Sequence, residues 1–136
     1  MTLYSIALIC AAGMIPTLVG ALWYHPRLFG EMWLRFVGVT PQMAEIAQRY
    51  RRIYSIYSLA TGIALSGALY VLLDAMHIIH VLDAIIVALG LVLFILVPTS
   101  IGDVLWEQKQ PKLYAIDTVY WTIVLIIVAS TVSFAL

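Results

Sequence analysis

Four long apolar stretches, separated by polar segments, dominate the chain. They cover about residues 3–24, 53–73, 81–105 and 113–136. Each has close to the length of about 20 residues that an α-helix needs to cross a bilayer. The alternating apolar and polar residues typical of a membrane β-barrel are not visible. The pattern therefore predicts an all-α, integral membrane four-helix bundle, with one four-span domain covering residues 1–136.

The connection between the first two spans is long enough to contain helices of its own. Apolar residues recur along it at helical spacing and predict a short helix in the membrane interface, which ends at Gly38. Thr40 and Pro41 match an N-cap and a first helical position. We expect this second helix to continue into span two through the arginines before residue 53. The apolar residues are Phe29, Met32, Trp33, Phe36 and Val37, and the arginines are Arg49, Arg51 and Arg52.

Composition supports a membrane protein and excludes an ordinary soluble enzyme. Apolar residues make up 64% of the chain and charged residues 10%, against about 45–50% and about 25% in soluble domains. No Lys or Arg precedes the first apolar stretch, so we expect a retained span there and not a secretory signal. Cys10 is the one cysteine, which excludes an intrachain disulfide.

All basic residues fall on connections that lie on the same side of such a bundle. Cytoplasmic loops carry an excess of Lys and Arg, and neither tail nor the loop between spans two and three holds any. We therefore expect insertion in the cytoplasmic (inner) membrane with both termini on the non-cytoplasmic side. The basic residues are Arg27, Arg35, Arg49, Arg51 and Arg52 before span two, and Lys109 and Lys112 before span four.

Small residues at four-residue spacing predict close helix contacts in the first two spans. Such stripes let helix backbones approach each other, either inside one bundle or across a dimer face. The stripes are Gly13, Thr17 and Ala21 in span one, and Ser58, Gly62 and Ser66 in span two. Prolines at positions 16 and 98 are expected to kink spans one and three. Spans one and three also end on the same Leu-Trp pair, which suggests an internal duplication or the common chemistry of the membrane interface.

The segment from Gly20 to Trp33 reads G-A-L-W-Y-H-P-R-L-F-G-E-M-W. It resembles the G-x-L-W-Y-x-P-x-x-F-G-x-x-W signature of a bacterial membrane family catalogued as domain of unknown function 1761. The resemblance implies four spans with this segment closing the first, and a bacterial inner membrane. His25 departs from the small residue usual in that pattern. The family brings no established activity.

Three carboxylates near the predicted cytoplasmic face are the first candidate site. Asp103 and Glu107 share a helix face, and Asp117 lies about one turn inside span four. Carboxylates at membrane depth are costly unless they face the bundle interior or pair with a partner. They indicate an ion-pair cluster between helix ends, a ligand site, or catalysis, although no nucleophile and base are recognisably paired. Neighbouring candidates for ligand binding are Tyr120, Trp23, His25 and Arg27.

The turn between spans two and three is the second candidate. Asp74, His77, His80 and Asp83 follow one another in steps of three, and both residue types are metal ligands. Steps of three on a continuous helix would spread the four side chains over half its circumference. A metal site would therefore require the helix to break near Ile78. The alternative is a polar turn exposed to water.

Aromatic residues gather toward the predicted cytoplasmic interface. They are Trp23, Tyr24, Trp33, Trp106, Tyr114, Tyr120 and Trp121. Such residues form a belt at the level of the lipid head groups, or they wall a pocket for an apolar ligand.

Three classes of function remain open. The pattern favours a structural or accessory subunit, as a homo-oligomer or in a larger membrane complex. The alternatives are a binding or transport module for a small solute, ion or lipid that uses the acidic cluster, and a membrane enzyme. No cofactor is indicated. No Gly-rich phosphate loop occurs, and no nucleic-acid partner is expected.

Overall fold

The computed structural model describes residues 2–136, and every element found there is helical. The elements are α1 (Leu3–Ala12), α2 (Ile15–Trp23), η1 (Pro26–Gly30), α3 (Glu31–Val37), α4 (Pro41–Arg49), α5 (Arg51–Ala75), α6 (Val81–Leu91), η2 (Val92–Leu96), α7 (Val97–Trp106) and α8 (Pro111–Ser133). Four helical stretches are long and apolar enough to cross a membrane, namely Leu3–Trp23, Arg51–Ala75, Val81–Trp106 and Pro111–Ser133. The prediction of an all-α fold with four such helices is confirmed.

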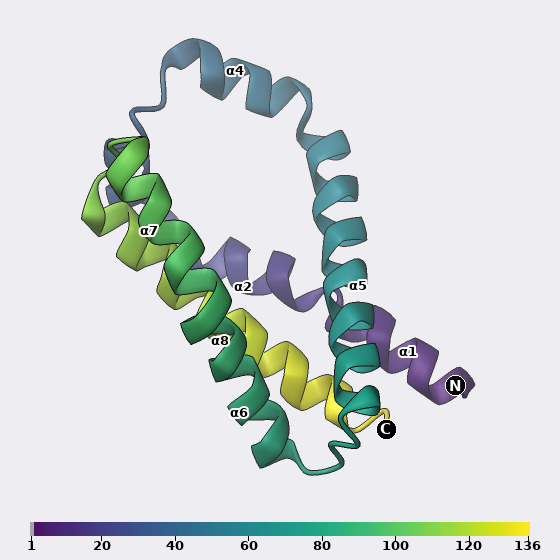
Figure 1. Cartoon of the computed structure of the whole chain (residues 1–136). Coiled ribbons are helices and arrows are strands. Elements are labelled where there is room, and N and C mark those ends of the chain that lie inside the picture. The colour runs from purple at the N-terminus through teal and green to yellow at the C-terminus, as the bar shows by residue number, and fades with distance from the viewer. Residues whose placement is uncertain (1) are drawn as a thin grey trace.

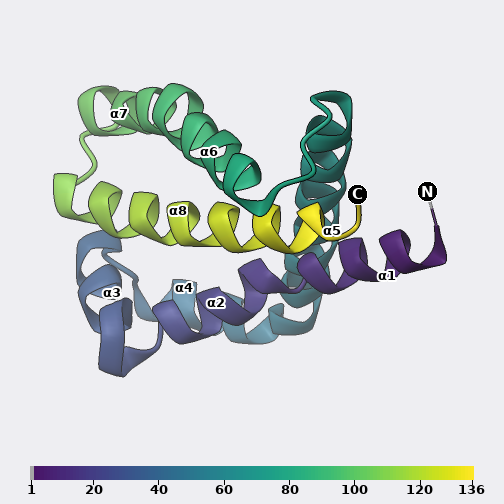
Figure 2. The same cartoon turned by 90° about the horizontal axis from the view of Figure 1, so that it is seen from below.

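Helix α8 is the central helix of the bundle. Figure 2 shows it between α1–α2 on one side and α6–α7 on the other. Its Val124, Val128 and Val132 are fully buried, as are Ala84 and Ala88 of α6. The two alanines lie one helical turn apart, so the backbone of α6 can approach α8 closely. Most of the core is therefore a contact between the third and fourth spans.

Span one crosses α5 at a point where two glycines meet (Figure 1). A Cβ on Gly62 would collide with the carbonyl oxygen of Gly13, and a Cβ on Gly13 would lie 2.6 Å from Ile63 Cγ1. One turn from this crossing, the hydroxyls of Thr17 and Ser58 share a hydrogen bond of 3.0 Å. The small-residue stripes of spans one and two thus pack against each other within one chain.

A further hydrogen bond fixes the register of this crossing. The buried hydroxyl of Ser66 donates to the carbonyl of Ile9 at 2.8 Å. The three contacts of the stripes therefore follow one another along both helices.

Both predicted kinks are present. Span one is interrupted at Gly13 and Met14, and Pro16 stands in the first turn of α2. Pro98 stands in the first turn of α7, directly after the π-helical segment η2. Proline lacks an amide hydrogen, and its ring clashes with the carbonyl four residues earlier, so the preceding turn widens or breaks. Spans two and four continue without interruption.

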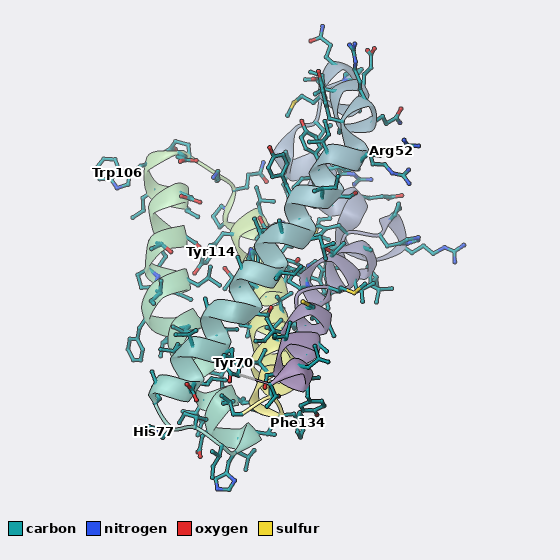
Figure 3. The ribbon with its side chains drawn as sticks, turned by 90° about the vertical axis from the view of Figure 1, so that its right-hand side faces the viewer. Arg52, Tyr70, His77, Trp106, Tyr114 and Phe134 are labelled. Carbon is teal, nitrogen blue, oxygen red and sulfur yellow. The ribbon has the colours of Figure 1, made fainter. Side chains whose placement is uncertain are left out.

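The two ends of the bundle differ in charge. All basic residues lie in two places, which we call the basic end. One runs from η1 to the start of α5, and the other from the connection after α7 to the first turn of α8. Figure 3 shows Arg52 and Trp106 at this end, and His77 and Phe134 at the opposite end. Both chain termini lie toward the opposite end (Figure 1).

The predicted interface helix is present as α3, which ends at Gly38 in the left-handed conformation (φ 69°). Helix α4 begins as predicted, with the Thr40 hydroxyl accepting a hydrogen bond from the Met43 amide at 3.3 Å. Its predicted continuation into span two is wrong, because the chain breaks at Tyr50 (φ −99°, ψ 11°). Helix α4 has one polar face, which suits contact with water, whereas α5 becomes apolar on all sides, which suits lipid or protein contact. The two helices therefore need different surroundings. Residues 41–61 are all exposed.

Substitution of Gly62 tests the crossing, and Gly67 on the same helix provides the control. Gly62→Ala places a methyl group against the Gly13 backbone, which should lower the free energy of unfolding by about 1–3 kcal/mol. Gly67 has no atom within 4 Å of an added Cβ, so Gly67→Ala should be neutral or stabilising by up to about 1 kcal/mol. Unfolding in mixed detergent micelles measures both. Equal effects would contradict the crossing.

Candidate functional site

The segment from Gly20 to Trp33 folds back on itself where span one ends. The amides of Leu28 and Gly30 both donate to the carbonyl of His25, at 2.9 and 3.1 Å. A Cβ on Gly30 would collide with the carbonyl oxygen of Tyr24. Only glycine therefore allows this tight turn, which leads directly into α3.

Aromatic side chains fill the inside of this turn. The rings of Trp23 and Phe29 stack with their centroids 4.4 Å apart. Tyr24 meets Trp33 edge-on at 5.4 Å, so residues nine apart in sequence pack together. The buried Nε1–H of Trp23 has no acceptor among residues 2–136. Ring contacts thus stabilise the turn together with its backbone hydrogen bonds.

Two tyrosine hydroxyls connect this segment to its neighbours. Tyr24 donates a hydrogen bond to Asp117 Oδ1 at 2.7 Å, which ties the end of span one to α8. Tyr120 donates to the carbonyl of Pro16 at 2.8 Å. The Tyr120 hydroxyl lies 3.3 Å from where a Cβ on Gly20 would be, so glycine leaves the room that the hydroxyl needs. These two bonds hold α8 against span one and its end.

A cleft of about 350 Å³ opens between α3, α7 and α8 at the basic end. Helix α3 contributes one wall, the third span another, and α8 the floor. Its lining residues are Trp33, Val37, Leu96, Ser100, Asp103, Val104, Lys109, Leu113, Tyr114, Asp117, Thr118 and Trp121. Figure 3 places Tyr114 within the bundle between Trp106 and the opposite end. The cleft combines charged, hydroxyl and aromatic groups.

The lining contains two carboxylates and one ammonium group. A left-handed residue, Gln108 (φ 55°), turns the chain after α7 so that Lys109 pairs with Asp103 at 3.3 Å and Glu107 at 2.8 Å. Hydrogen bonds to Glu107 and Asp103 raise the pKa of Lys109, so its positive charge persists into more alkaline solution. Asp117 takes part in no ion pair among residues 2–136. Its charge is therefore available to the cleft.

Two hydroxyl groups in the cleft are also uncommitted. Within residues 2–136, every Ser and Thr side chain makes a hydrogen bond except Ser100 and Thr118. The others bind a neighbouring side chain or backbone group, and six of these thirteen donate to the carbonyl four residues earlier. Both unpaired hydroxyls line the same cleft.

The structure brings only part of the predicted acidic site together. Asp103 and Asp117 line the cleft, while Glu107 lies outside it and pairs with Lys109. Tyr120 faces span one, and Trp23 stacks within its own turn. The four residues that the prediction placed beside the carboxylates therefore do not line the cleft.

The remaining two of these residues are exposed. His25 Nδ1 accepts a hydrogen bond from the Arg27 amide at 3.2 Å, and both side chains face outward. His25 thus helps to close the turn before α3.

Ser100 and Thr118 were not identified from the sequence as lining residues of the cleft, although their spacing indicates which helix face each occupies. Tyr114, Asp117, Thr118 and Trp121 are spaced by three and four residues, which places them on one face of α8. Ser100 stands three residues before Asp103 on α7 in the same way. What the pattern does not show is that these two faces lie opposite each other.

The aromatic residues divide between the two predicted roles. Trp33, Tyr114 and Trp121 line the cleft, as the pocket hypothesis requires. Trp106 is 87% exposed and points away from the bundle (Figure 3), as a belt residue would.

The turn at the opposite end is a helix stop. His77 adopts the left-handed conformation (φ 54°). The His77 amide donates to the backbone carbonyl of Asp74, and the Ile78 amide donates to the backbone carbonyl of Leu73 at 2.9 Å. This is the Schellman pattern that ends a helix. The chain is therefore non-helical around Ile78, where a metal site would require the helix to break.

The acidic and histidine side chains of this turn remain apart. Asp74, His77, His80 and Asp83 are all exposed. Residues 2–136 contain no group of three or more His, Cys, Asp or Glu side chains that could hold a metal ion. The geometry gives the metal hypothesis no support, and it stays a prediction.

The chain belongs to the family described as "Protein of unknown function (DUF1761)", which matches residues 7–133. The resemblance seen in the sequence is thereby confirmed. No curated protein matches the chain, and no solved structure does.

A double-mutant cycle tests the bond between Tyr24 and Asp117. Tyr24→Phe and Asp117→Ala each remove one partner of this bond and should destabilise the fold, and their coupling free energy should be about 0.6–1.7 kcal/mol, as for hydrogen bonds between membrane helices. Unfolding of the four variants in mixed micelles measures it. Tyr57→Phe is the control, because Tyr57 is exposed on α5 and should show no coupling. Additive effects at Tyr24 would contradict the bond.

Proposed function

We propose that this member of a family without an assigned activity binds an organic cation in the cleft between α3, α7 and α8. In this proposal the chain is integral to a bacterial inner membrane, with the basic end in the cytoplasm and both termini outside. The position of every Lys and Arg at one end supports this orientation. The cleft then opens toward the cytoplasmic interface.

The observation that carries the proposal is the uncompensated charge of Asp117. Lys109 is already shared by Asp103 in the last turn of α7 and Glu107 directly after it. The cleft therefore retains an excess of one negative charge, with a hydrogen-bond donor, Tyr24, fixing one oxygen of Asp117. An ammonium group would neutralise this charge and could donate a hydrogen bond to the other carboxylate oxygen of Asp117.

The other walls of the cleft suit the same ligand. Trp33, Tyr114 and Trp121 offer aromatic faces, against which a cation is stabilised by about 0.5–1 kcal/mol. Ser100 and Thr118 offer free hydroxyls. A charge-assisted hydrogen bond adds about 1.5–3 kcal/mol. Together these terms correspond to weak, roughly millimolar binding of a small ligand.

Titration with hexylammonium tests the proposal. Protein in maltoside micelles should show a saturable change in tryptophan fluorescence, because Trp33 and Trp121 line the cleft. Hexanol and hexanoate, of the same length but neutral and negative, should not saturate. Asp117→Asn should weaken hexylammonium binding by about tenfold, the effect of losing about 1.4 kcal/mol.

The matched control is Asp83→Asn at the opposite end, which should leave binding unchanged because Asp83 is exposed and far from the cleft. Equal responses to all three hexyl compounds would contradict the proposal. So would wild-type affinity in the folded Asp117→Asn variant.

A second candidate function is that of an assembly subunit, either as a homo-oligomer or in a larger complex. Residues 41–61 are all exposed, although half of this stretch belongs to a helix long and apolar enough to span a membrane. Ile53, Ile56 and Tyr57 present apolar surface there. Figure 1 shows this part of α5 standing away from α6 and α7. Such a surface suits a partner helix.

Cysteine cross-linking tests the assembly function. In a Cys10→Ser background, Tyr57→Cys should form disulfide-linked dimers in membranes if copies meet along α5. Phe94→Cys provides the control, since Phe94 is 76% exposed but lies on the third span. Dimers at both positions or at neither would contradict self-association through α5.

A further inference from the structure

We infer that the ligand is a membrane lipid with an ammonium head group, bound with one acyl chain in the groove beside the cleft. This inference rests on the proposed function and names the ligand class for the same site. It depends on a second cavity, on its connection to the first, and on the depth of each.

The second cavity is an apolar groove of about 290 Å³. It lies between α5 and the third span, on the surface of α8. Its lining residues are Leu65, Leu91, Ile95, Leu96, Thr99, Trp121 and Leu125. The hydroxyl of Thr99 donates to the carbonyl of Ile95 at 2.7 Å, so the polar group of this residue is already satisfied. The groove therefore presents hydrocarbon.

The groove and the cleft share two residues. Leu96 and Trp121 line both cavities. A molecule in the cleft can therefore extend past Trp121 into the groove. The combined space is charged and polar at one end and apolar at the other, which is the pattern of an amphiphile.

The depth of each part matches a lipid. Asp117 lies six residues from the start of α8, or about 9 Å along the helix axis. Leu125 lies eight residues further, or about 12 Å deeper. A head group at Asp117 would thus remain near the interface while its chain lies at hydrocarbon depth.

The arrangement of the helices explains why the groove stays open to lipid. Helix α5 packs mainly against α1, α2 and α8 and diverges from α7 toward the basic end (Figure 1). The wide turn η2 before Pro98 forms the facing wall. An acyl chain gains no hydrophobic free energy by leaving the bilayer for this groove, because both are hydrocarbon. The head group must therefore supply the selectivity.

Charge identifies the head group. An anionic lipid would bring a phosphate beside Asp117, with Lys109 already paired to Asp103 and Glu107. A phosphoethanolamine head group brings its own ammonium for Asp117. Its phosphate can accept hydrogen bonds from the free hydroxyls of Ser100 and Thr118. Phosphatidylethanolamine is therefore the probe of choice.

Native mass spectrometry of the full chain tests the inference. Protein released from nanodiscs with equal amounts of phosphatidylethanolamine and phosphatidylglycerol should retain one phosphatidylethanolamine, in about tenfold preference. Asp117→Asn should abolish the preference. Ile95→Trp should fill the groove and lower retention about tenfold, yet leave the hexylammonium titration unchanged. Phe94→Trp is the matched control, because Phe94 lies outside the groove.

A second measurement locates the chain without any substitution. Phosphatidylethanolamine with a diazirine in one acyl chain should cross-link mainly within residues 91–96 and at Leu125. Cross-links spread evenly over the bundle, or no preference between the two lipids, would overturn the inference. If hexylammonium binding still depended on Asp117 in that case, the proposed function would stand. If hexylammonium failed to bind at all, both would fall.

Discussion

The close crossing of span one and α5 at Gly13 and Gly62 is the contact on which the rest of the structure depends. Two backbones can touch there only because neither residue has a side chain. This close contact holds the middle of α5, and the half of the helix toward the basic end stands away from the bundle (Figure 1). The divergence leaves α4 as a bridge over the basic end. It also leaves the space between α5 and the third span in which the apolar groove lies.

The cleft depends on a second contact, between Tyr24 and Asp117. The tight turn around Gly30 directs Tyr24 toward α8, and its hydroxyl holds the carboxylate at one side of the cleft. The same turn carries α3, so that Trp33 becomes a wall of the cleft while its ring packs on Tyr24. The segment that resembles the family signature is therefore a positioning element. Its residues hold the cleft in shape, and apart from Trp33 they do not line it.

Those features that depend on local sequence could be predicted, and those that depend on pairing between distant residues could not. Chain length and apolar composition locate the four spans, and Pro16, Pro98 and Gly38 locate two kinks and a helix end. The helix break at Tyr50 was not predicted, because no Gly or Pro marks the position. The break follows from the different surroundings of α4 and α5. The bond from Tyr24 to Asp117 joins residues 93 apart, and no local pattern encodes it. For the same reason, the hydroxyls of Ser100 and Thr118 could be placed on helix faces but not in one cleft.

Lipid binding in the groove and assembly along α5 both involve the space beside α5, so they are thermodynamically coupled. A lipid chain in the groove lies between α5 and the third span, against Leu65 and Ile95. A second copy that packs closely along the exposed part of α5 would narrow or occupy that space. The ligand and the partner then compete, and each lowers the affinity of the other by the same factor. Conversely, a partner that contacts only the outer side of α5 would hold the helix in its divergent position and favour lipid binding. The sign of this coupling distinguishes a lipid-regulated assembly from a lipid-binding subunit that requires assembly.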